Sequence, residues 1–200
     1  LNLILKLYEP SSGDIFIDGH NIREIKSGFL KAQIGAALQE PFLLNDTVEN
    51  NIRYGRKNIE REEIDKISGI CRINEFIRGL PKGYQTIVGE NACKISEGQK
   101  QKIAIARALA KNPKILILDE AFSSMDSESE EKIIRNIREN FKNITLIAVS
   151  HRLSTVLRAD LVYFLNGSCR LRIGKGSRLL KEDEGFFALF AGQSEGNNSK

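Results

Sequence analysis

Two continuous aliphatic runs constrain the fold of this 200-residue chain more than any other feature. They are residues 115–118 (Ile-Leu-Ile-Leu) and residues 144–149 (Ile-Thr-Leu-Ile-Ala-Val). Both are far shorter than the roughly 18 residues that a membrane span needs. Residues 96–110 and 127–140 have helical spacing, and they alternate with the two runs along the chain. Buried strands that alternate with helices indicate an α/β fold with a parallel sheet covered on both faces.

Smaller elements are predicted around this sheet. The patterns indicate a helix at residues 1–8, strands at 14–18 and 33–38, and a mainly helical middle. Towards the C-terminus they indicate a hairpin of residues 161–165 with 170–173, followed by terminal helices within residues 179–190. We therefore expect one domain over residues 1–200. It would hold a helical subdomain at about 46–96, a core with the C-terminal helices at 97–192, and a polar tail at 193–200.

Charge and cysteine content exclude some classes of protein. The net charge of +4 is spread along the chain without a basic stripe, so charge alone gives no reason to expect a nucleic-acid partner. The three cysteines, Cys71, Cys93 and Cys169, are odd in number, far apart and free of C-x-x-C spacing. This pattern fits reduced thiols in a cytosolic compartment.

Asp119 and Glu120 end the first aliphatic run, at the edge where open α/β sheets place their ligands. Successive residues that leave a strand point in different directions, so the two carboxylates can have separate roles. Asp119 can hold Mg²⁺, directly or through water, while Glu120 can orient and polarise an attacking water. The alternative is a strand that simply ends in acidic loop residues.

Residues 96–99 (Ser-Glu-Gly-Gln) satisfy a capping box, which by itself indicates only the start of a helix. The same geometry suits phosphate. A helix N-terminus presents unpaired N–H groups and a positive dipole, the Ser96 hydroxyl adds a donor, and Gly98 allows a close approach to the backbone. Both interpretations can hold at once.

Two polar residues follow other predicted strands. His151 comes just after the second aliphatic run, and Gln39 follows the strand at residues 33–38. Each would reach the same sheet edge as Asp119, where His151 could contact a terminal phosphate. Taken singly, both have an ordinary structural explanation, and His20 lies in a hairpin-like turn at the surface.

The order of these motifs resembles the nucleotide-binding domain of an ATP-binding cassette (ABC) transporter over nearly the whole chain. The motifs are Gln39, then residues 95–99, 115–120, 123–126 and 150–155. The resemblance implies a parallel sheet of the P-loop NTPase type with an ABC helical subdomain and antiparallel β elements. Residues 8–10, 151–155 and 186–190 are most similar to the exporter branch.

The resemblance also implies roles for individual residues. Asp119 and Glu120 resemble the Walker B aspartate, which binds Mg²⁺, and the catalytic glutamate. His151 resembles the switch histidine, and Gln39 the Q-loop glutamine that senses Mg²⁺ and faces the membrane domain.

Other matching positions lie at expected interfaces between subunits. Ser96, Gly98 and Gln99 resemble the signature that closes on the ATP of the opposite subunit. Asp126 belongs to a segment that resembles the D-loop, which crosses the dimer interface. Residues 86–90 resemble the loop with which many exporters contact their transmembrane helices.

ATP and Mg²⁺ are therefore the expected ligands, and ATP-driven closure of two such domains is expected to drive export across a membrane. The implied partners are a second nucleotide-binding domain, in a homodimer or a heterodimer, and a transmembrane domain fused upstream, with no nucleic acid. The domain would lie on the cytoplasmic face of the membrane. Two alternatives stay open: an ABC-type ATPase that acts on nucleic acid or the ribosome, and a non-enzymatic subunit that offers its signature to a partner.

Two features depart from the family pattern. The signature has Ile95 and Glu97 where the commonest form has Leu and Gly, which is tolerable if the Glu97 side chain turns to solvent. The phosphate-binding motif G-x-x-x-x-G-K-[ST] does not occur in the chain. Because residues 1–8 resemble the helix that follows this motif, we expect an N-terminally truncated domain whose phosphate loop lies just upstream.

We predict that the 200-residue chain by itself hydrolyses ATP at a negligible rate, because the lysine and hydroxyl groups of that motif hold the phosphates and Mg²⁺. Phosphate release by the purified chain is the measurement. Magnesium-dependent turnover that is proportional to chain concentration and lost in Glu120→Ala would contradict this expectation.

Overall fold

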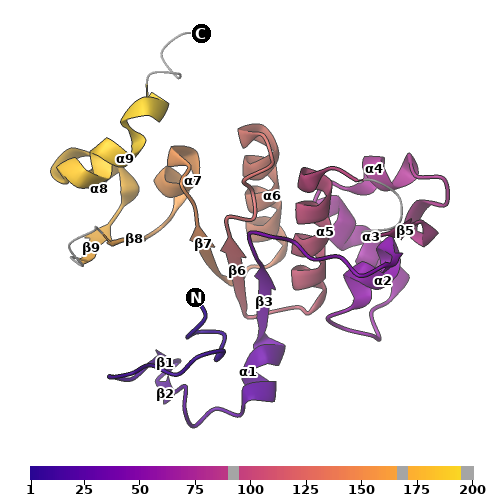
Figure 1. Ribbon diagram of the computed structural model, residues 1–200, viewed down its shortest axis with the longest axis horizontal. Helices are drawn as coiled ribbons and strands as arrows, with labels where there is room; N and C mark the ends of the chain where they lie inside the picture. The colour runs from indigo at the N-terminus through magenta and orange to yellow at the C-terminus, as the bar shows by residue number, and fades with distance from the viewer. Residues whose placement is uncertain (90–94, 166–170, 195–200) are drawn as a thin grey trace. The chain divides into compact units, whose positions relative to one another are not determined.

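The computed structural model describes residues 1–89, 95–165 and 171–194. The chain forms two compact units, Leu1–Ala148 and Val149–Lys200, which are described one at a time (Figure 1). Cys93, Cys169, part of the expected hairpin and most of the expected tail lie outside the described residues. Within the described ranges, no helix is long and apolar enough to cross a membrane.

The first unit is built on the predicted parallel sheet. Its strand order is β3 (Ile34–Ala37), β6 (Ile115–Asp119) and β7 (Thr145–Val149), and β7 ends on the first residue of the second unit. The β3 and β6 strands are parallel, with Ile34 beside Ile115 and Ala37 beside Leu118. Two long helices accompany the sheet, α5 (Glu97–Ala110) before β6 and α6 (Ser127–Asn140) after it. The aliphatic runs thus form neighbouring strands, and β6 is buried as predicted. The prediction of a second buried strand is wrong for β7, which is half-buried to exposed along its length and has a neighbouring strand on one side only within the described sheet.

The middle of the chain is mainly helical, as predicted. It contains α2 (Val48–Arg53), α3 (Arg61–Ile70), α4 (Asn74–Arg78) and the 3₁₀ helix η1 (Gly83–Gln85). A short antiparallel pair, β4 (Asp46–Thr47) with β5 (Ile87–Val88), joins the two ends of this helical group. Figure 1 shows α5 between these helices and the sheet, and α5 packs against α2, α3 and β3.

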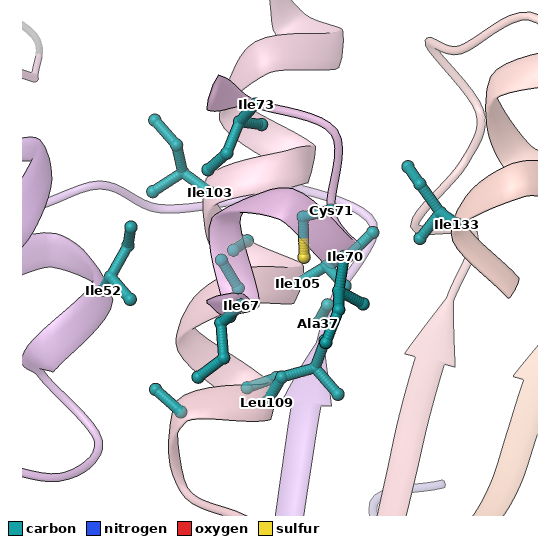
Figure 2. Packing of buried hydrophobic residues seen from close by; sticks show 14 of the residues in the cluster. Ala37, Ile52, Ile67, Ile70, Cys71, Ile73, Ile103, Ile105, Leu109 and Ile133 are labelled. Carbon is teal, nitrogen blue, oxygen red and sulfur yellow. The ribbon is translucent and has the colours of Figure 1, made fainter. Parts of the chain in front are cut away.

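The α5 helix is the centre of the main hydrophobic core. Ile103, Ile105 and Leu109 are at most 1% exposed, and burial of each such side chain contributes about 1.5–3 kcal/mol. Figure 2 shows them among the isoleucines of α2, α3 and α6, together with Cys71. Burial raises the pKa of the Cys71 thiol well above its usual range, so this cysteine is a core residue in its neutral form.

The predicted helix at residues 1–8 is wrong. These residues form turns, and Lys6 ends the single helical turn in the left-handed region, with φ of 54°. The Lys6 ammonium donates hydrogen bonds to the carbonyls of Ile22 (2.9 Å) and Ile25 (2.8 Å), on the segment after the hairpin of β1 (Phe16–Ile17) and β2 (His20–Asn21). These long-range bonds outweigh a helical preference that lacks an N-cap.

The described part of the second unit consists of a hairpin and three helices. Its elements are α7 (Leu153–Arg158), β8 (Val162–Leu165), β9 (Leu171–Gly174), α8 (Gly176–Glu182) and α9 (Glu184–Ser194). The hairpin is antiparallel, with Tyr163 beside Ile173, as the sequence predicts. Phe186 makes edge-to-face contacts with Phe164 and Phe190 at ring distances of 5.1 and 5.2 Å, and these rings form a separate small core.

We predict opposite effects of the same substitution at two glycines of the first unit. A Cβ on Gly35 of β3 would lie 2.5 Å from the carbonyl oxygen of Ala108 in α5, so Gly35→Ala should destabilise the fold by about 1–3 kcal/mol. Gly28, exposed in α1 (Ser27–Gln33), has nothing within 4 Å of such a Cβ, so Gly28→Ala should stabilise by about 0.5–1 kcal/mol. Urea denaturation of both variants is the measurement. An equal change in the free energy of unfolding for the two variants would show that α5 does not pack closely against β3 at Gly35.

Candidate functional site

Three of the predicted site residues leave the same edge of the sheet. Asp119 is the last residue of β6, Glu120 follows it, and Gln39 comes two residues after Ala37 at the end of β3. Because Ala37 lies beside Leu118 in a parallel pair, Gln39 and Glu120 emerge from adjacent strand ends. Gln39 is exposed, whereas both carboxylates are half-buried. The register thus brings these three residues to the carboxyl edge, where α/β sheets bind ligands.

The backbone of Glu120 is unusual. Its φ is 48°, in the left-handed region that residues other than glycine rarely adopt. The Glu120 carbonyl accepts a hydrogen bond from the Ser123 amide (3.0 Å), and the intervening Ala121 and Phe122 are buried. Such conformations cost about 1–3 kcal/mol, persist only where the surroundings enforce them, and cluster at active sites. The sequence placed Glu120 at the strand end but contained no sign of this turn.

The N-terminus of α5 has the predicted capping box. The Ser96 hydroxyl accepts a hydrogen bond from the Gln99 amide (3.3 Å), and the Gln99 side-chain carbonyl accepts one from the Ser96 amide (2.8 Å). The Ser96 hydroxyl still has its own proton to donate, as does the side-chain NH₂ of Gln99. Ser96 is exposed, so the positive end of a 14-residue helix is open to an anion.

Glu97 does not compete for that position. Its exposed carboxylate accepts a hydrogen bond from the Lys100 ammonium (3.1 Å), one turn further along α5. The ion pair offsets the negative charge that Glu97 brings to the signature. The side chain therefore turns to solvent, which is the condition under which the sequence departure is tolerable.

A close backbone contact, besides phosphate access, explains why a glycine stands at position 98. A Cβ at this position would lie 2.9 Å from the carbonyl oxygen of Ser124, a backbone atom of the segment that resembles the D-loop. The start of α5 and the loop after Glu120 therefore pack directly against each other. A glycine is needed wherever two backbones approach this closely.

Gln101 is a residue of this region that sequence analysis missed. It is 1% exposed, its side-chain NH₂ donates to the Ser123 hydroxyl (2.8 Å), and its side-chain carbonyl accepts from the Ser124 amide (3.2 Å). The signal was present in the helical spacing, which puts Gln101 on the same face as the core residue Ile105. A polar side chain on a core face needs a buried hydrogen-bonding partner.

Asp126 caps the next helix. Its carboxylate accepts hydrogen bonds from the Ser129 hydroxyl and the Ser129 amide, both at 2.7 Å, at the start of α6. The hydroxyl and then the amide lower the pKa of Asp126 below its ordinary value. This capping function accounts for an aspartate at this position and leaves open the interface role that the resemblance implies.

Asn51 and Arg107 hold the segment that follows Gln39. Asn51 is fully buried in α2 and accepts hydrogen bonds from the Leu44 amide (2.9 Å) and the Arg107 guanidinium (2.6 Å). Arg107 in α5 also donates to the carbonyl of Phe42 (2.7 Å), and burial lowers its pKa. The network fastens the loop between Gln39 and α2 to the same helix that begins at Ser96. Sequence analysis found neither residue.

Two further predicted features lie in other parts of the chain. His151 belongs to the second unit, where it precedes α7, and is therefore described separately from Glu120. In the segment 86–90, Thr86 is buried and its hydroxyl accepts from the Lys82 amide (3.1 Å), while Glu90 lies outside the described residues.

Comparison with known proteins gives the family. The model of the family "ABC transporter" matches residues 1–123. ABC transporter B family member 21 of Arabidopsis thaliana is 40% identical over 188 residues, which are 94% of this chain and 14% of that protein. The mouse protein ATP-binding cassette sub-family B member 10, mitochondrial, is 39% identical over 94% of this chain and 27% of its own length.

A solved structure agrees in fold. A bacterial Atm1-family ABC exporter with ATP bound superposes with a TM-score of 0.90 and 39% identity, over 96% of this chain and 34% of that one. The fold is thus of the α/β class and matches that of an ABC nucleotide-binding domain. The chain belongs to the ABC transporter family. It spans between about a seventh and a third of the length of these relatives.

We predict that Asp126→Asn removes a pH-dependent part of the stability. Because folding lowers the pKa of Asp126, its ionised form contributes stability above the unfolded pKa of about 3.9, and this contribution is lost as pH falls through the folded pKa. Asparagine keeps a capping oxygen without the charge. The urea midpoint of the wild-type chain should exceed that of the variant at pH 7, and the difference should shrink towards pH 3. A difference that persists unchanged at pH 3 would contradict the assigned hydrogen bonds.

Proposed function

We propose that this chain is the ATP-binding and ATP-hydrolysing domain of an ABC exporter. In this proposal ATP lies between two such domains, their closure drives substrate across a membrane, and hydrolysis reopens the pair. The observation that carries the proposal is the constrained backbone of Glu120 directly after β6, together with an open and capped N-terminus of α5 in the same unit. The family match and the likeness to an exporter with ATP bound support it.

Glu120 would act on water. The turn from residue 120 to residue 123 fixes the backbone that carries the Glu120 carboxylate, and this group can accept the proton of a water molecule as that water attacks the terminal phosphate. His151 would contact the same phosphate, as the resemblance implies, and would help to position the water.

The donor set at the strand end fits Mg²⁺. Nucleotide-associated Mg²⁺ is typically held by one or two carboxylates together with phosphate oxygens, and Asp119 offers one half-buried carboxylate with Gln39 at the adjacent strand end. When bound, Mg²⁺ would neutralise charge that develops on the phosphate oxygens. Asp119 would hold the ion, and Gln39 would report its presence to the membrane domain.

The N-terminus of α5 would bind the ATP of the partner domain. The proton of the Ser96 hydroxyl, the NH₂ of Gln99 and the amides near Gly98 are donors that suit a phosphate. Asp126 would lie at the dimer interface. The implied partners are a second nucleotide-binding domain and a transmembrane domain, with this domain on the cytoplasmic face of the membrane.

The test of this function is Glu120→Gln in the complete transporter. The amide keeps the shape of the side chain but cannot take a proton from water, so we expect kcat to fall about 100-fold or more with ATP binding retained. Glu62→Gln, on the exposed face of α3, is the matched control and should leave kcat unchanged. Near-normal hydrolysis by Glu120→Gln would remove Glu120 from the mechanism.

A further inference from the structure

Gln101 occupies a buried position of α5 that an apolar side chain could fill, yet Gln101 is polar. It sits one turn after the capping box, 1% exposed, next to the fully buried Ile103 and Ile105 of α5. Burial of an amide side chain costs free energy unless its donors and acceptors are satisfied, and an apolar residue would fill the same space without that cost. Two hydrogen bonds satisfy this amide, and a residue that served packing alone would need neither of them.

Both hydrogen bonds reach the loop that follows Glu120. Gln101 donates to the Ser123 hydroxyl at 2.8 Å and accepts from the Ser124 amide at 3.2 Å, and the Ser123 amide in turn donates to the Glu120 carbonyl at 3.0 Å. The chain of contacts from α5 thus ends on the residue with φ of 48°. All of these residues belong to the first unit.

We propose that Gln101 is a positioning residue that couples the signature end of α5 to the backbone of Glu120. The inference rests on the proposed function. The N-terminus of α5 would engage ATP in the partner's site, whereas Glu120 would act in the site of its own subunit. A shift of α5 as it engages ATP is passed to residues 123 and 124, and from there to the peptide that fixes the Glu120 side chain.

The chemistry of the contact selects glutamine. One side chain must present a donor to a hydroxyl oxygen and an acceptor to the next backbone amide, which the two ends of a carboxamide do at once. Asparagine is one methylene shorter, and methionine has the length of glutamine but offers the amide only a weakly accepting sulfur. The contact at Gly98, where Ser124 comes within 2.9 Å of a Cβ position, keeps the two segments at the distance that glutamine spans.

The test is Gln101→Met in the complete transporter, with steady-state ATP hydrolysis and thermal unfolding measured together. Two hydrogen bonds are lost while the volume is kept, so we expect kcat to fall about tenfold with KM for ATP within about twofold of wild type. A residue that only supports the fold would lower the amount of folded protein, and this alone lowers the apparent kcat without changing KM. The kcat is therefore expressed per folded transporter that binds ATP, and a purely structural role would leave that value unchanged. The matched control is Asn136→Ala, which removes the hydrogen bond from α6 to the Ile70 carbonyl and should leave kcat unchanged.

A double-mutant cycle with Ser123→Ala shows whether the effect passes through the loop. Ser123→Ala should lower kcat about threefold, and the double variant should be no slower than Gln101→Met alone. An unchanged kcat in Gln101→Met, a parallel change in KM, or effects that multiply in the double variant would overturn the proposal. Glu120→Gln, measured in the same assay, separates the two claims: if it abolishes hydrolysis while Gln101→Met does not slow it, the proposed function stands and the role of Gln101 falls. A wild-type transporter without ATP hydrolysis would overturn both.

Discussion

The rest of the first unit depends on the burial of α5. This helix packs against β3, α2 and α3, and its apolar residues occupy the middle of the largest core. Its polar residues are also used: Arg107 binds the carbonyl of Phe42 and the side chain of Asn51, while Gln101 binds the loop after Glu120. The bonds to Asn51 and to the loop after Glu120 are partly buried, where unpaired groups would be costly. One buried helix thereby fixes the position of both loops at the sheet edge.

This arrangement gives two successive turns of α5 different roles. Its first turn is open and capped, and the negative charge of Glu97 in this turn is offset by the ion pair with Lys100. Its second turn holds the segment that carries Glu120. In an ABC transporter domain, recognition of the partner's nucleotide and alignment of the proposed catalytic carboxylate would then depend on the same rigid element. The left-handed conformation of Glu120 is the local strain that such support maintains.

The sequence predicted features that depend on local pattern and missed those that depend on distant contacts. The strand at Ile115–Asp119 and the capping box at Ser96 follow from burial on both faces and from four adjacent residues. Gln101 and its partner Ser123 are 22 positions apart, and Arg107 and Asn51 are 56 apart, so neither pair leaves a local pattern. The prediction of a helix at residues 1–8 failed for the same reason, because the Lys6 ammonium binds carbonyls 16 and 19 positions away.

Hydrogen exchange of backbone amides tests most directly whether α5 and the loop after Glu120 behave as one body. The Ser124 amide, which donates to Gln101, should exchange as slowly as the amide of Ile105 in α5. Both should open only when the whole first unit unfolds, and should gain the same stability when the protein binds ATP. Rapid exchange at Ser124 while Ile105 stays protected would show that the loop moves independently of the helix, and would contradict the account.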